Sequence, residues 1–120
     1  MLQAGLFPDF KNADSLLIWG DAQGISKLAA AIAALSLGNT PTIKVGDLSI
    51  SASDDDEQPP EVSHTGSGLV WVCPRAVLLE AEALIAGLDE AASGHQFINV
   101  TGVADQVIVS KSEYPETLRP

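Results

Sequence analysis

The sequence has a single cysteine, Cys73, among its 120 residues, so no disulfide can form within the chain. One isolated thiol fits a reducing compartment, and we expect a cytoplasmic protein. No apolar run approaches the roughly 20 residues of a membrane-spanning helix. The first residues also lack the charged and apolar regions of a signal peptide. These absences predict a protein that is neither secreted nor inserted in a membrane.

Positive charge is scarce, because six Lys and Arg residues stand against sixteen Asp and Glu residues. The resulting net charge of −10 would repel phosphate groups, which disfavours binding to nucleic acids and to anionic membrane surfaces. The same charge attracts cationic partners over a distance. Solubility alone also favours an acidic composition, so the charge narrows the class of partner without identifying one.

The sequence also lacks recognisable motifs for catalysis or for binding a cofactor. Gly66-Ser67-Gly68 matches neither glycine-rich pattern that binds phosphates. One cysteine and two distant histidines, His64 and His95, cannot complete a tetrahedral zinc site. Cys73 ends an apolar run before a proline, which favours a buried, inert thiol over a nucleophile. We therefore expect a protein that is not an enzyme, with no catalytic residue, cofactor or metal.

Hydrophobic periodicity predicts two helices. One begins after Asp21, whose carboxylate is suited to cap the first turn, and ends at Gly38. The other covers residues 75–92 and ends at Gly94, which places His95 at the helix C-terminus, where a charged imidazole is favourable. Short apolar or alternating runs predict six strands, at residues 16–19, 42–45, 48–52, 69–72, 97–100 and 107–109.

These elements repeat as strand, helix, strand, strand, and we interpret the chain as one domain over residues 1–120 with an internal pseudo-repeat. Trp19 and Trp71 fall at matching positions of the two halves and are expected in the core. The order predicts an α+β two-layer sandwich, with two helices on one face of a mixed, mostly antiparallel sheet of about six strands. Residues 1–15 are expected to form an irregular lead-in that packs Phe7 or Phe10 on the body or adds a short edge strand.

Residues 54–68 separate the two halves with an acidic, Pro-, Gly- and Ser-rich segment, expected to be a solvated linker. Its carboxylates lack the ligand spacing, the central glycine and the distal glutamate of a calcium loop. A different interpretation is a docking loop for a basic partner, since no Lys or Arg lies between Val45 and Pro74. The predicted contact residues of such a loop are Asp54, Asp55, Asp56, Glu57 and Glu61.

The last third of the chain resembles small bacterial immunity proteins of polymorphic toxin systems. The resemblance lies in Gly94-His95-Gln96-Phe97 and in Val107-Ile108-Val109-Ser110-Lys111-Ser112-Glu113-Tyr114-Pro115. It implies a non-enzymatic inhibitor that binds one cognate protein toxin. The Glu-Tyr-Pro segment would then end the last strand, and Tyr114 would pack on the sheet or form a hydrogen bond back to it.

Three functions follow as hypotheses. The first is a cytoplasmic immunity protein that blocks a basic toxin with its acidic surface. The second is a small-molecule-binding or enzymatic domain, which would require an apolar pocket with polar groups that include His95 or Cys73. The third is a homodimeric structural subunit joined through an edge strand or an exposed sheet face.

Overall fold

The computed structural model describes residues 1–120, which form two helices and nine strands. The helices are α1 (Ala22–Ser36) and α2 (Arg75–Glu90). The strands are β1 (Leu2–Phe10), β2 (Ala13–Gly20), β3 (Thr42–Val45), β4 (Leu48–Ser53), β5 (Glu61–Thr65), β6 (Gly68–Pro74), β7 (Gly94–Asn99), β8 (Thr101–Gly102) and β9 (Gln106–Lys111). Neither helix has the combination of length and apolar character required to span a bilayer.

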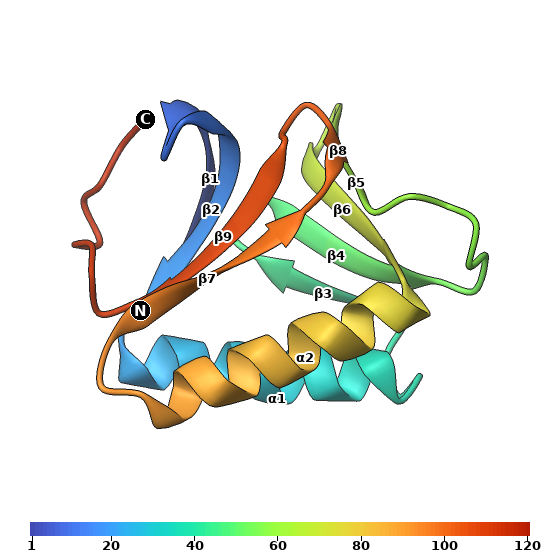
Figure 1. Cartoon of the computed structure of the whole chain (residues 1–120), viewed down its shortest axis with the longest axis horizontal. Helices are drawn as coiled ribbons and strands as arrows, with labels where there is room; N and C mark the ends of the chain where they lie inside the picture. Colours follow the sequence, from blue (N-terminus) through green and yellow to red (C-terminus); the bar gives the residue numbers. More distant parts are fainter.

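The strands form two mixed sheets, which we name sheet A, with strand order β1-β2-β9-β7, and sheet B, with strand order β3-β4-β6-β5-β8. The predicted α+β class is confirmed, but the single sheet of about six strands is wrong. Strands β2 and β9 pair in parallel, as do β4 and β6, so each sheet contains strands from both halves of the chain. The two helices lie side by side beneath both sheets (Figure 1).

Residues 1–15, expected to be an irregular lead-in that could add a short edge strand, and the expected solvated linker both contain strands. Residues 1–15 contain β1, a long edge strand whose Leu2–Phe7 segment pairs with Ser15–Gly20 of β2. The predicted linker contains β5, which pairs with both β6 and β8. Neither segment has a continuous apolar run. This fits their places in the fold, since β1 lies at the edge of sheet A and most of β5 is exposed. Each of these strands pairs with the strand that follows it across a two-residue turn, and β5 also pairs with the distant strand β8.

The helix ends predicted from local sequence signals lie close to the observed ends of α1 and α2. The Asp21 side chain caps α1 as predicted, accepting a hydrogen bond from the backbone N–H of Gly24 at 2.8 Å. Gly38 follows α1 with φ of +78°, a conformation that glycine adopts without strain. Helix α2 ends at Glu90, and Gly94 already begins β7. His95 therefore lies in a strand, and its predicted place at a helix C-terminus is wrong.

One hydrophobic core fills the space between the helices and the inner faces of both sheets. It contains residues from sheet A, sheet B and both helices, among them Ile18, Ile32, Ile50, Trp71 and Ile85. The burial of so much apolar surface is the main force that holds the layers together. Because all the major elements contribute to the same core, we expect the chain to behave as one cooperative unit.

The two tryptophans are both buried but do not occupy equivalent positions. Trp71 lies in the main core, whereas Trp19 lies on the opposite face of sheet A. Successive side chains of a strand point to opposite faces, so an alignment that is wrong by one residue exchanges core and surface. Ile18, the neighbour of Trp19, enters the main core, as does Leu16 on the same face of β2. The predicted core location is confirmed and the predicted equivalence is wrong.

The outer face of sheet A carries a second apolar cluster, formed by Phe7, Leu17, Trp19 and Ile108. Residues 112–120 run along this face and cover part of it. The Trp19 indole N–H donates a hydrogen bond of 2.9 Å to the Pro115 carbonyl, and the rings of Phe10 and Tyr114 meet edge to face at 5.7 Å. Tyr114 packs on the sheet as expected, and the tail screens Trp19 from water.

Candidate functional site

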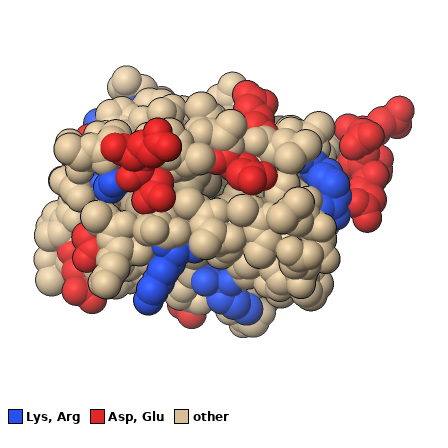
Figure 2. Space-filling model, turned by 90° about the horizontal axis from the view of Figure 1, so that it is seen from below, with Lys and Arg blue, Asp and Glu red and all other residues tan.

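The predicted docking residues lie at one end of the molecule. Residues 54–57, which we name the acidic loop, belong to the connection between β4 and β5, and all four are exposed. This connection projects beyond the helices at the right of Figure 1. Figure 2 shows a group of acidic side chains projecting at the same end of the molecule. The loop is shaped by two short hydrogen-bonded turns, in which Ser53 Oγ accepts from the Asp55 N–H and Asp55 Oδ1 accepts from the Glu57 N–H.

One of the four carboxylates has a counter-ion. Arg75 Nε lies 2.9 Å from Asp54 Oδ1, and the same guanidinium donates to the Ser36 carbonyl at the C-terminus of α1. Asp54 therefore helps to anchor the loop to the helix pair. Asp55, Asp56 and Glu57 form no ion pair, so their charges are open to a partner.

Glu61 is exposed at the first position of β5, on the sheet itself, and is separated from the acidic loop by Gln58, Pro59 and Pro60. The structure thus brings four of the five predicted residues into one loop and sets the fifth on the adjoining strand. No group of three or more His, Cys, Asp or Glu side chains is arranged to hold a metal ion.

His95 belongs to a small polar cluster on the outer face of sheet A. Its Nδ1 lies 3.0 Å from Glu113 Oε1, and the Ser110 hydroxyl donates to the same oxygen at 2.6 Å. Partial burial would by itself raise the pKa of Glu113, but these two hydrogen bonds and the nearby positive charge of Lys11 outweigh it and lower the pKa. Ser110 is fully buried and bonds to the acid instead of the imidazole. This arrangement leaves no activated serine nucleophile.

Neither of the remaining candidate groups forms a reactive site. Cys73 is fully buried in the core, and this burial raises the pKa of its thiol to about 12. The thiol therefore stays protonated at neutral pH and is a poor nucleophile. His64 is exposed in β5, and its imidazole has no ion-pair partner within the chain.

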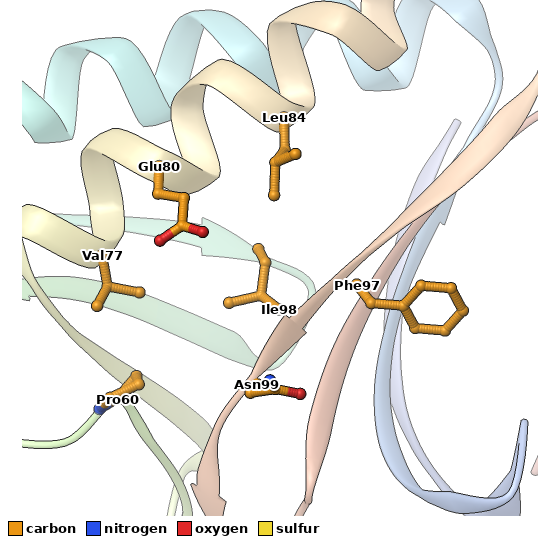
Figure 3. Close-up of a pocket in the computed structure, with 7 residues that line it drawn as sticks. All are labelled: Pro60, Val77, Glu80, Leu84, Phe97, Ile98 and Asn99. Carbon is orange, nitrogen blue, oxygen red and sulfur yellow. The ribbon is translucent and has the colours of Figure 1, made fainter.

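A shallow pocket lies beside the acidic end, between α2 and β7. Its volume is ≈ 200 Å³, and its walls are shown in Figure 3. Four of the seven lining residues are hydrophobic; the lining consists of Pro60, Val77, Glu80, Leu84, Phe97, Ile98 and Asn99. His95 and Cys73 are not among them, so the pocket lacks the groups that the small-molecule or enzymatic hypothesis required.

The sequence contained part of the signal for this pocket. Val77 and Leu84 belong to the apolar residues that recur at helical spacing in α2, and Glu80 lies between them at the same spacing, so the three share a face. The missing information was the position of the sheet edge. Only the strand order shows that this face of α2 lies next to β7, the last strand of sheet A.

The chain matches no protein-family model, no curated protein sequence and no solved structure. Its function is therefore inferred from the acidic loop and the adjoining pocket.

Proposed function

We propose that the chain is a non-enzymatic, cytoplasmic binding protein that acts as the immunity protein of a basic bacterial toxin. The observation that carries this proposal is the acidic loop, which projects from the body and presents Asp55, Asp56 and Glu57 without counter-ions. A net charge of −10 extends the negative field beyond the loop. The resemblance of the last third of the chain to immunity proteins supports the same function.

The mechanism would be occlusion. A toxin that acts on nucleic acid needs a basic surface to hold phosphates, and the acidic loop can occupy that surface by placing carboxylates where phosphates would lie. Opposite charges mainly accelerate the encounter, and packing around the contact determines how long the complex lasts. The ion pair between Asp54 and Arg75 already restricts the loop in the free protein, so the loop loses less conformational entropy on binding.

The internal repeat is a second part of the proposal. Each half would contribute a hairpin, a helix and a second hairpin, with β1, β2, β4 and β3 matched to β5, β6, β9 and β7. Under this correspondence the order β1-β2-β9-β7 of sheet A becomes β5-β6-β4-β3, which is the order of the first four strands of sheet B in reverse. The parallel pairs β2–β9 and β4–β6 also correspond.

The proposal is tested by capture of the partner from the source cell and by survival during toxin expression. The triple variant Asp55→Asn/Asp56→Asn/Glu57→Gln removes the three unpaired charges and keeps the side-chain shapes. We expect the association rate with the captured toxin to fall at least about tenfold at low salt. The control is Glu82→Gln/Glu90→Gln/Glu116→Gln, which removes the same charge elsewhere and should change the rate less than about threefold. Survival that does not depend on the protein would contradict the proposal.

A further inference from the structure

Strand β7 has an open edge. It is the last strand of sheet A and pairs only with β9. The N–H of Val100, the residue after β7, points to the β9 side and donates to the carbonyl of Asp105, the residue before β9, at 3.1 Å. Alternate residues of a strand direct their N–H groups to opposite edges, so Phe97 and Asn99 direct theirs away from β9. No backbone hydrogen bond within the chain satisfies that side of β7.

The open edge is continuous with a pairing that the chain already uses. Just beyond β7, the Thr101 N–H donates to the Pro60 carbonyl at 2.9 Å, and β8 pairs in parallel with β5. A backward extension of β5 would therefore lie along the open edge of β7. Pro59 and Pro60 prevent this extension, because proline has no N–H to donate and the chain departs there into the acidic loop. The position beside β7 is left free, next to the acidic loop.

The floor of this free position is one face of α2. Val77, Glu80 and Leu84 line the pocket from the helix side, and Figure 3 shows them on α2, facing the strand that carries Ile98 and Asn99. A sheet normally covers the apolar stripe of a helix, but Val77 and Leu84 are only partly buried here. The Glu80 carboxylate has no cationic partner in the structure. The floor thus offers two apolar contacts with a negative charge between them.

We propose that β7 pairs with an extended segment of a basic partner protein, which adds a strand to sheet A over the pocket. On its inner face this segment would carry a Lys or Arg that reaches Glu80, flanked by apolar side chains that contact Val77 and Leu84. Main-chain hydrogen bonds to Phe97 and Asn99 would provide affinity, and the inner-face side chains would provide specificity. The inference rests on the proposed binding function and adds a second contact beside the acidic loop.

Charge complementarity selects this partner over a second copy of the chain. Two copies paired through β7 would each bring a net charge of −10 and a Glu80 carboxylate to one interface. Like charges brought together oppose association, whereas a basic segment neutralises Glu80 and the loop at once. The occupant we infer is therefore a lysine- or arginine-bearing strand of another protein.

The test uses a synthetic peptide, acetyl-Thr-Leu-Thr-Lys-Thr-Leu-Thr-amide, whose inner face carries leucine, lysine and leucine. Titration is followed by the backbone amide signals of the whole protein in NMR. We expect the largest shifts at β7 and the facing side of α2, with slower hydrogen exchange at the amides of Phe97 and Asn99. Glu80→Lys should weaken binding at least about tenfold, whereas Glu90→Lys, an equal charge reversal at an exposed site of the same helix, should change it less than about twofold.

Three results would overturn the inference. One is the absence of binding at millimolar peptide, and another is binding that is equally strong when the peptide lysine is replaced by glutamate. The third is self-association through β7, detected as a dimer by light scattering and lost in Phe97→Pro. None of these results affects the outcome of the capture test, which uses the variant with the acidic loop neutralised. Failure of the strand pairing can therefore be distinguished from failure of the immunity function.

Discussion

At the scale of single residues, two cations complete the ends of the two helices. Neither helix has a basic residue in its own last turn. Arg75 donates to the Ser36 carbonyl at the end of α1, and Lys111 Nζ donates to the carbonyls of Asp89 and Ala91 at the end of α2, at 2.7 and 2.6 Å. The carbonyls at a helix C-terminus lack intrahelical partners and carry partial negative charge, so each cation stabilises the helix that it contacts.

Replacement of Lys111 by methionine tests this role. Lys111 is only 5% exposed, and methionine keeps its apolar stem while leaving two partly buried carbonyls without this donor. We expect the free energy of unfolding to fall by about 1–3 kcal/mol, measured by urea denaturation. Lys44→Met, at an exposed site whose ammonium group forms no ion pair, is the control and should change stability by less than about 0.5 kcal/mol. Equal stability of the two variants would show that Lys111 does not cap α2.

At the scale of elements, the two helices contain glycines that look alike in the sequence and differ in the fold. A Cβ built on Gly24 in α1 would overlap the carbonyl oxygen of Met1, because the start of the chain packs directly on this turn. A Cβ built on Gly87 in α2 would have no heavy atom within 4 Å. Helix propensity favours alanine over glycine at both positions, so only tertiary contact separates them.

The alanine variants of these glycines should have opposite effects. Gly87→Ala is expected to stabilise the protein by about 0.5–1 kcal/mol, because alanine restricts the unfolded chain and fits the helix without a clash. Gly24→Ala is expected to destabilise it by about 1–3 kcal/mol, because the Met1 backbone must move to accommodate the methyl group. Thermal unfolding followed by circular dichroism measures both. A gain in stability from Gly24→Ala would mean that Met1 and Leu2 do not pack on α1 in solution.

At the scale of the whole molecule, the two halves exchange strands. Sheet A combines β1 and β2 with β9 and β7, while sheet B combines β3 and β4 with β6, β5 and β8. The main core likewise draws on both halves, with Ile18 and Ile50 beside Trp71 and Val109. Neither half can complete a sheet or bury its helix alone, so we expect the chain to fold in one step.

The fluorescence of the two tryptophans can test whether the chain unfolds in one step, because each tryptophan monitors a different region. Trp71 lies in the main core and Trp19 in the outer cluster, so Trp19→Phe leaves a probe of the first and Trp71→Phe a probe of the second. Within each variant, the fluorescence transition in urea should coincide with the loss of far-UV circular dichroism. Separate fragments covering residues 1–54 and 55–120 should remain unfolded by the same spectroscopy. A fluorescence transition at lower urea than the circular dichroism transition in Trp71→Phe would instead show that the outer cluster opens independently.

Local patterns in the amino-acid sequence were sufficient for both helices, for six of the nine strands and for the exposed acidic loop, since helical periodicity, alternation and composition act over a few neighbouring residues. Only the tertiary structure decided the full length of β1, strands β5 and β8, the division into two sheets, the opposite faces of Trp19 and Trp71, and the pocket beside β7. Each of these features is set by which strands pair and in which register. Register is decided by the burial of the whole core, because a shift of one residue reverses every side chain of a strand.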